Sequence, residues 1–406
     1  MFSLERFYNI LHDNLISNFI NNKSIYFYPF GTFDQTGVVS NRSDVNWYRS
    51  QTIKESSFQC CFLDQEPIYE NTPIINNWTD FHPRILNRTP SPKIITVIAN
   101  SEKSEYKNTR LREEGYYDWY YFYHGFAALD WYRDFQYIRP NLFDNFTKVF
   151  ICYNNYISNF RSYRLHLVSN LISHDLVKFG DVSFFLQDKF GTWQQEIVNP
   201  YSLLDRRAKK HIFQTLNSVT EPLVIDVREP HGALSASVDF AQLTDAFWHI
   251  VTETVYFLPK LHLTEKTFKP IIAQRPFILA AAPGNLAYLR SYGFRTFDRW
   301  IDESYDHEPD HYLRIEKITR EIARLCAMTP EQLKTMHNEM QETLLYNYRH
   351  FYGEFKTIIV NELVDNFEGV LQRFNNGRQP NNHSKYHHRF DLSKEYLQEV
   401  KQRLLK

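Results

Sequence analysis

Short apolar runs alternate with helix-like or polar segments along most of this chain, and this alternation limits its fold more than any other feature. Strands that alternate with helices form parallel sheets whose faces are covered, so we predict an α/β protein. The predicted strands fall into two series, Ser24–Pro29, Gln59–Leu63, Lys93–Ile98, Trp119–Tyr123 and Val149–Tyr153, then Val182–Leu186, Leu223–Val227, His249–Val255 and Pro276–Ala281.

Two series of strands predict two Rossmann-like domains, and 406 residues are enough for both. Asn154-Asn155 interrupts the pattern, so we place an N-terminal domain at residues 1–155 and a C-terminal domain at 156–350. Residues 351–406 are predicted to be a helical extension, with a loose Asn- and His-rich linker at 375–389. Helices are expected at Arg161–Leu176, Leu203–Thr215, Val238–Phe247, Leu286–Tyr292, Tyr312–Leu325, Pro330–Tyr348 and Leu392–Leu405.

Composition narrows the class of protein. A hydrophobic content of 43% with 23% charged residues is globular, and a net charge of −1 argues against a broad nucleic-acid surface. Cys60, Cys61, Cys152 and Cys326 have no metal-binding or redox spacing. Neither a signal peptide nor an apolar run of about 18 residues is visible, so we expect no membrane span and a cytoplasmic location.

The segment Thr264-Glu265-Lys266 carries the strongest indication of a binding site. Thr264 is predicted to cap a helix whose first turn contains Glu265 and Lys266. The start of a helix presents free N–H groups to a phosphate, Lys266 adds a positive charge, and Glu265 can accept hydrogen bonds from sugar hydroxyls. A capped helix with a polar first turn and no ligand is the alternative.

Further polar residues are expected beside the same ligand. Arg161 and Arg164 lie three residues apart on one predicted helix face, and Arg can hold phosphate oxygens with two hydrogen bonds. Glu253 ends an apolar strand and is a candidate contact to the sugar or ribose, unless it simply reaches solvent there. Gly284 follows the strand at Pro276–Ala281 and should border the site, because ligands bind beyond the carboxyl ends of parallel strands.

Thr264-Glu265-Lys266, followed by a helix and the strand Arg275–Ala281, resembles the donor-binding motif of the α-1,3-fucosyltransferase family. Asn159–Arg164, leading into Leu165–Leu176, is similar to the family's Arg-bearing helix. Phe247–Glu253 stands where the family has an aromatic-rich strand, with Thr254 in place of its following Asn and Leu263 in place of a Val. A longer stretch, which adds Gly293–Phe297 and Ile301–Asp306, is similar to glycosyltransferase-like proteins of bacteriophages.

The resemblance implies a nucleoside diphosphate sugar as donor substrate. It also implies the GT-B fold, in which two Rossmann-like domains face each other across a cleft. The first domain would then supply the catalytic base. Asp64 and Glu66 follow a strand and point to one side of an extended segment, with Glu66 preferred and His124 in reserve. Turn-forming acids before Pro67 are the alternative.

We therefore expect a glycosyltransferase, inverting and metal-independent, with no cofactor, because cations rather than a metal would stabilise the leaving diphosphate. The acidic stretch Asp302–Asp310 is predicted to be a solvated loop in which Asp310 caps the next helix.

The expected acceptor is a glycan, a small molecule or a hydroxymethylated base in DNA. A DNA acceptor would need a basic stripe such as the one containing Lys103, Lys107, Arg110 and Arg112. A non-catalytic virion or interaction protein with the same fold is the third possibility. The expected setting is the cytoplasm of a bacterium or of a phage-infected host cell.

Overall fold

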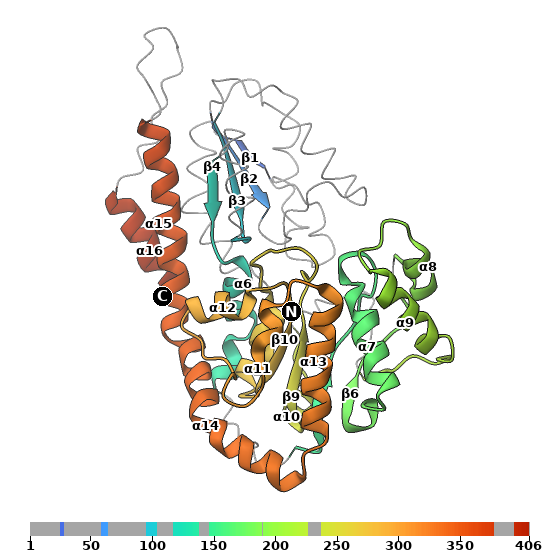
Figure 1. Ribbon diagram of the computed structural model, residues 1–406. Helices are drawn as coiled ribbons and strands as arrows, with labels where there is room; N and C mark the ends of the chain where they lie inside the picture. The colour runs from blue at the N-terminus through green and yellow to red at the C-terminus, as the bar shows by residue number, and fades with distance from the viewer. Residues whose placement is uncertain are drawn as a thin grey trace. The chain divides into compact units, whose positions relative to one another are not determined.

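The chain contains two four-stranded parallel β-sheets, and helices lie between the strands of the second, as a computed structural model shows (Figure 1). It belongs to the predicted α/β class. The chain divides into two compact units. The first unit contains Met1–Trp131, His231–Ala233 and Lys356–Lys406, and the second contains Tyr132–Pro230 and Leu234–Phe355. The structure describes residues 25–27, 58–63, 95–103, 117–137, 146–188, 190–225, 237–376 and 394–405. Among these, no helix is both long enough and apolar enough to cross a membrane.

The first unit contains a sheet of four parallel strands in the order β1-β2-β3-β4. Each described strand pairs with the next one along the chain, so the spatial order of these strands follows their order in the sequence. Helix α6 follows β4 directly. The bounds are β1 Ile25–Phe27, β2 Phe58–Leu63, β3 Ile95–Asn100, β4 Tyr117–Tyr120 and α6 Tyr123–Trp131.

The C-terminal helices α15 (Glu354–Asn376) and α16 (Lys394–Leu405) also contribute to this unit. The indole N–H of Trp119 on β4 donates to the carbonyl of Leu363 at 3.1 Å, and its ring lies 4.7 Å from that of Phe367. Helix α16 buries Leu397, Val400 and Leu404. The predicted helical extension is therefore part of the first unit's fold, and most of its predicted linker lies outside the described residues.

The second unit is built on a four-stranded parallel sheet in the order β10-β9-β5-β6. Every residue of β9 is buried, which explains its continuous apolar and aromatic sequence. The bounds are β5 Lys148–Cys152, β6 Gly180–Val182, β9 Ala246–Thr252 and β10 Phe277–Ala280.

Strand pairing corrects three predictions. The strand at Val149–Tyr153 was assigned to the first domain, but β5 pairs with β6 and β9, so the units do not divide at residue 155. The strand expected at Val182–Leu186 begins earlier, at Gly180, where a Cβ atom would lie 2.6 Å from the carbonyl oxygen of Phe150 on β5. In the described part of Leu223–Val227, Leu223 forms only an isolated bridge with Phe184.

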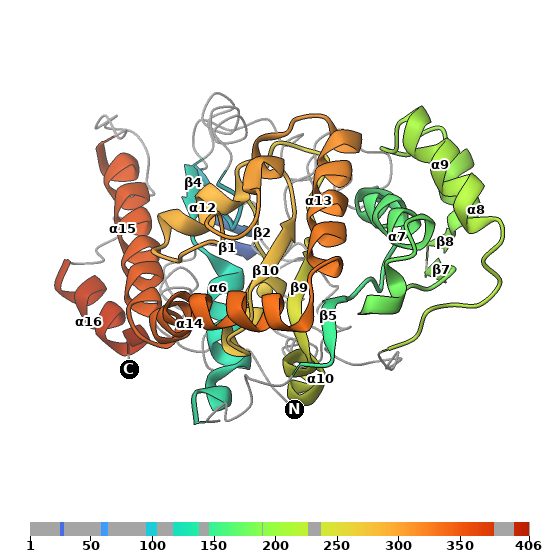
Figure 2. The same cartoon turned by 60° about the horizontal axis from the view of Figure 1, so that its bottom comes forward.

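Helices α7 and α13 lie side by side, and α13 contacts β5 and β10 (Figure 1). Helix α9 packs on α7, and α8 lies beside α9 at the edge of the unit (Figure 2). Helix α14 contacts α11, on the path between β9 and β10. The bounds are α7 Tyr163–Ser173, α8 Trp193–Val198, α9 Arg206–Leu216, α10 Phe240–Asp245, α11 Phe268–Ile272, α12 Asn285–Ser291, α13 His311–Cys326 and α14 Pro330–Tyr352.

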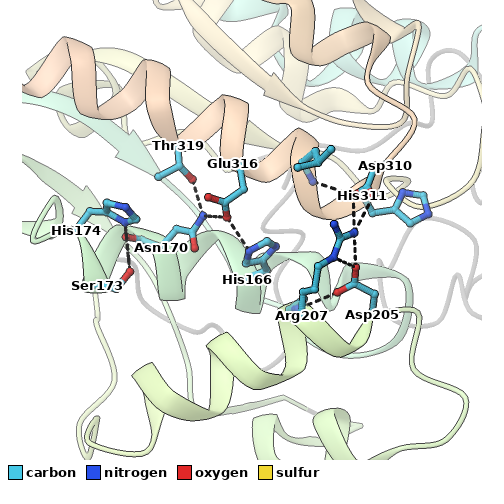
Figure 3. A network of polar contacts seen from close by, with 12 residues as sticks. His166, Asn170, Ser173, His174, Asp205, Arg207, Asp310, His311, Glu316 and Thr319 are labelled. Carbon is cyan, nitrogen blue, oxygen red and sulfur yellow. Dashed lines mark hydrogen bonds and ion pairs between the residues drawn. The ribbon is translucent and has the colours of Figure 1, made fainter.

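Polar contacts connect α7, α9 and α13 (Figure 3). On α7, the amide of Asn170 donates to Glu316 Oε1 of α13 at 2.9 Å, and His166 Nε2 lies 3.2 Å from the same oxygen. Arg207 of α9 binds both oxygens of Asp310, at 2.9 and 2.7 Å. The contact between Arg207 and Asp310 fixes the segment between β6 and α10 to the body of the unit.

Two glycines give a matched test of this fold. Gly293 has a φ of 91°, and a Cβ there would lie 2.8 Å from the ring of the buried His350. We expect Gly293→Ala to lower the free energy of unfolding by about 2–4 kcal/mol through left-handed strain and overpacking. Gly369 lies within α15, and no atom lies within 4 Å of a Cβ built there, so Gly369→Ala should stabilise by about 0.5–1 kcal/mol. Urea denaturation of both variants checks the prediction, and a neutral effect of Gly293→Ala would contradict it.

Candidate nucleotide-sugar site

The carboxyl edge of the second sheet contains the point at which its strand order reverses. From β5 the chain passes to β6 on one side and then crosses to β9 on the other. Ligands of open parallel sheets bind beside such a switch point. Four segments leave this edge, and those after β5, β9 and β10 carry most of the predicted donor-binding residues (Figure 1).

The carboxylate of Glu253, directly after β9, holds the Thr264–Thr267 turn in place. Oε1 accepts hydrogen bonds from the Thr264 N–H at 3.0 Å and the Thr267 hydroxyl at 2.6 Å. Oε2 accepts from the Thr264 hydroxyl at 2.6 Å and from the N–H of Thr254 at 3.3 Å. Glu253 is fully buried. Its oxygens are therefore used within the protein, which differs from the sugar contact predicted for it.

Buried side chains on α7 and α13 bind the carbonyls at the same edge. Tyr163 donates to the carbonyls of Glu253 at 2.6 Å and Ala280 at 3.2 Å, and its ring stacks on Tyr256 with centroids 4.0 Å apart. Burial raises the pKa of Tyr163 to about 12, so its hydroxyl stays a donor at neutral pH. From α13, Arg314 donates to the carbonyls of Tyr256 and Ala281 at 2.7 and 2.9 Å.

Arg164, predicted to hold phosphate, also binds the main chain. Its Nη1 donates to the carbonyl of Tyr156 at 3.0 Å and its Nη2 to that of Thr252 at 2.6 Å. The side chain is buried, and its Nε has no partner among the described residues. Arg164 thus fastens the loop after β5 to the end of β9, and its two terminal nitrogens are occupied.

Arg161 has a different position, in the 3₁₀ turn η4 (Asn159–Arg161) that leads into α7. It is half-buried, and its guanidinium lies 5.7 Å from the centre of the Tyr156 ring. Because it comes just before Tyr163 and Arg164, the contacts of those two residues fix this turn beside the end of β9. This turn therefore places the partly exposed side chain of Arg161 near the carboxyl edge of the sheet.

Two carboxylates that the sequence did not single out shape the loop after β5. Asp188 Oδ2 accepts from the N–H groups of Ile157 and Ser158 at 2.8 and 2.9 Å, and Glu196 accepts from that of Asn159 at 3.0 Å. Burial raises the pKa of Glu196. The N–H groups at the entry to α7 are thus already bound by carboxylates, and no local pattern in the sequence marks this pairing.

Two further polar atoms in the same loop are buried without a partner among the described residues. They are Oδ1 of Asn154, just past β5, and Oγ of Ser162, at the start of α7. Both side chains are fully buried. Buried polar atoms of this kind cost stability unless a water binds them, and because neither residue is exposed, they are not surface contacts for a ligand.

The Thr264-Glu265-Lys266 segment forms a turn that differs from the predicted α-helix. Thr264 caps the 3₁₀ turn η6 (Glu265–Thr267), which α11 follows. Lys266 Nζ donates to Glu265 Oε1 at 3.0 Å and to Thr264 Oγ1 at 3.1 Å. Its side chain is 34% exposed, whereas that of Glu265 is buried. An ammonium has three donors, so the described contacts leave one N–H of Lys266 for a ligand.

Gly284 and the acidic stretch lie beyond β10. Gly284 has a φ of 83°, and its N–H donates to the carbonyl of Asp306 at 2.8 Å.

In the acidic stretch Asp302–Asp310, Asp310 caps α13 through the N–H of Leu313, as predicted. Glu303 and Asp306 are buried, which raises their pKa values, so a fully solvated loop was a wrong prediction. Glu303 accepts from the N–H of Phe297, and Asp306 from that of Leu286.

The candidate bases belong to the first unit. Asp64 and Glu66 lie outside the described residues, directly after β2. His124 was predicted at the end of a strand, but β4 ends at Tyr120 and His124 lies buried in the first turn of α6. Of the three candidate bases, the structure therefore describes only His124, which is a residue of helix α6.

Comparison with protein-family models, curated proteins and solved structures finds no match to this chain. The resemblance to the α-1,3-fucosyltransferase family thus stays a prediction. The contacts of the site's own residues must carry any conclusion about its chemistry.

Glu253 gives the sharpest test of how this edge is held. We expect Glu253→Gln to lower the free energy of unfolding by about 3 kcal/mol, because an amide cannot accept from every donor that now faces the carboxylate. Glu342→Gln is the matched control, since Glu342 is exposed and pairs with an exposed Arg295, and it should change stability by less than about 0.5 kcal/mol. Equal losses in the two variants, measured by urea denaturation, would show that the Glu253 contacts do not stabilise the fold.

Proposed function

We propose that the second unit binds a nucleoside diphosphate sugar and that the protein is a glycosyltransferase. The observation that carries the proposal is the fixed position of the Thr264–Lys266 turn at the switch point. Glu253 binds this turn through buried hydrogen bonds, and Tyr163 fixes the start of α7 to the carbonyl of the same residue. Lys266 and Arg161 are thereby presented from two segments that meet at Glu253.

Lys266 and Arg161 would stabilise the negative charge that develops on the leaving diphosphate. Because Asp188 and Glu196 already bind the N–H groups before α7, side-chain cations rather than that helix start must supply most of the attraction. Glu265, whose carboxylate pairs with Lys266 in the same turn, would accept from ribose or sugar hydroxyls. The finer GT-B arrangement, with a catalytic base on the first unit, belongs to this proposal.

Lys266 tests the donor site. We expect Lys266→Ala to weaken binding of the preferred nucleoside diphosphate by about 1.5–3 kcal/mol, or roughly 10- to 150-fold in Kd, since a charge-assisted contact is lost. Lys266→Arg should retain most of the affinity. Lys334→Ala, on the exposed face of α14, is the control and should bind like the unchanged protein. Calorimetry that finds the same Kd for Lys266→Ala and Lys334→Ala would refute the assignment.

The catalytic base is tested by replacing each candidate with its nearest uncharged isostere. We expect Glu66→Gln to leave donor binding intact and to slow sugar transfer by about 10²–10⁴-fold, because a general base contributes this much. Asp64→Asn and His124→Gln serve as parallel variants. The measurements are donor affinity, release of nucleoside diphosphate and melting temperature. Full turnover in all three would place the base elsewhere or indicate a retaining mechanism.

A further inference from the structure

The segment between β6 and α10 forms a projection at the edge of the second unit. It contains the hairpin β7 (Gln187–Asp188) and β8 (Gly191–Thr192), and then α8 and α9 (Figure 2). Helix α9 buries Ala208, Ile212 and Leu216 and packs on α7. Its apolar stripe is thus used within the fold, and its other side faces away from α7.

Large apolar side chains are exposed on and beside this projection. Phe213 of α9 is 53% exposed, Tyr201 66% and Val198 76%. Leu313 is also exposed, in the first turn of α13, next to the Asp310 that Arg207 binds. Among the described residues, Leu345 is the one exposed large hydrophobic that lies elsewhere. Val198 ends α8, Tyr201 lies in the connection to α9, and α8 and α9 are in contact, so we call Val198, Tyr201 and Phe213 the apolar surface. Phe190 is not part of it, because its ring lies 6.2 Å from that of Tyr156, in the loop after β5. Neighbouring exposed apolar side chains of this kind are typical of an interaction site.

Positive charge accompanies the apolar surface. Arg206, Lys209 and Lys210 lie in the first half of α9, and no acidic residue occurs from Arg206 to Thr220. Arg206, Lys210 and Phe213 follow helical spacing along one outward stripe. Arg207 is the exception, since Asp205 and Asp310 bind it (Figure 3). The outward stripe is therefore both cationic and apolar.

We propose that this surface binds an anionic lipid bilayer. Lysine and arginine beside exposed aromatic and aliphatic side chains match an anionic headgroup layer with acyl chains beneath it. Exposed Tyr and Phe suit the boundary between headgroups and hydrocarbon. A nucleic acid fits less well, because bases stack on aromatic rings but give no role to Val198. The proposal is independent of the donor site and requires no membrane-spanning helix.

Vesicle flotation with the full chain tests the proposal. We expect binding to vesicles of phosphatidylcholine with phosphatidylglycerol, little binding to phosphatidylcholine alone, and weaker binding as salt rises. Lys210→Ala should weaken binding about fivefold, since each basic residue near an anionic surface contributes about that factor. Phe213→Ala should weaken it by roughly tenfold, and this loss should persist at high salt because it comes from apolar burial.

Matched variants on α14 serve as controls. Lys334→Ala and Leu345→Ala remove an exposed lysine and the remaining exposed leucine, and both should bind vesicles normally. All four changes are on the surface, so unchanged melting temperatures should accompany them. No binding to anionic vesicles at low salt would overturn the proposal, as would equal losses in the control variants. Tighter binding to single-stranded oligonucleotides than to vesicles would assign the surface to nucleic acid instead.

Discussion

The candidate site depends on the hydrogen bonds that the buried carboxylate of Glu253 accepts. It lies at the end of β9 and accepts hydrogen bonds from the main chain and side chains of the Thr264–Thr267 turn. A buried carboxylate is stable only when donors surround it, and here the turn supplies most of them. Tyr163 and Arg164 then fix the start of α7 to carbonyls of the same strand end. The end of β9 thus sets the geometry of both segments that approach the switch point, through the Glu253 carboxylate for the turn and through main-chain carbonyls for the start of α7.

This arrangement divides the charged residues between structural and binding roles. Glu253, Arg164, Asp188 and Glu196 are occupied by the protein's own main chain or hydroxyls. Lys266 keeps part of its side chain in solvent, and Arg161 is half-buried in the turn before α7. A fixed frame with partly exposed cations suits the electrostatic stabilisation that the proposed function requires, because such a frame need not reorganise during a reaction.

Local patterns predicted most elements of the fold. Apolar periodicity within a single segment was enough to predict the strand at Gln59–Leu63 and the long helices at Tyr312–Leu325 and Pro330–Tyr348. Pairing between strands depends on contacts far apart in the sequence, so β5 was placed in the wrong sheet. Contacts between distant parts of the sequence also explain which residues of the site were missed. Thr264 was recognised as a cap, but the roles of Asp188 and Glu196 arise only when their helix and hairpin fold against the loop after β5.

The central claim is that a nucleoside diphosphate binds at the carboxyl edge of the second sheet. Hydrogen exchange monitored by mass spectrometry, with and without the nucleoside diphosphate that most raises the melting temperature, tests it directly. We predict that the ligand slows exchange mainly in two segments, residues 153–164 and 262–268, which contain Arg161 and Lys266. No slowing with any nucleoside diphosphate, or slowing confined to other segments, would contradict the account.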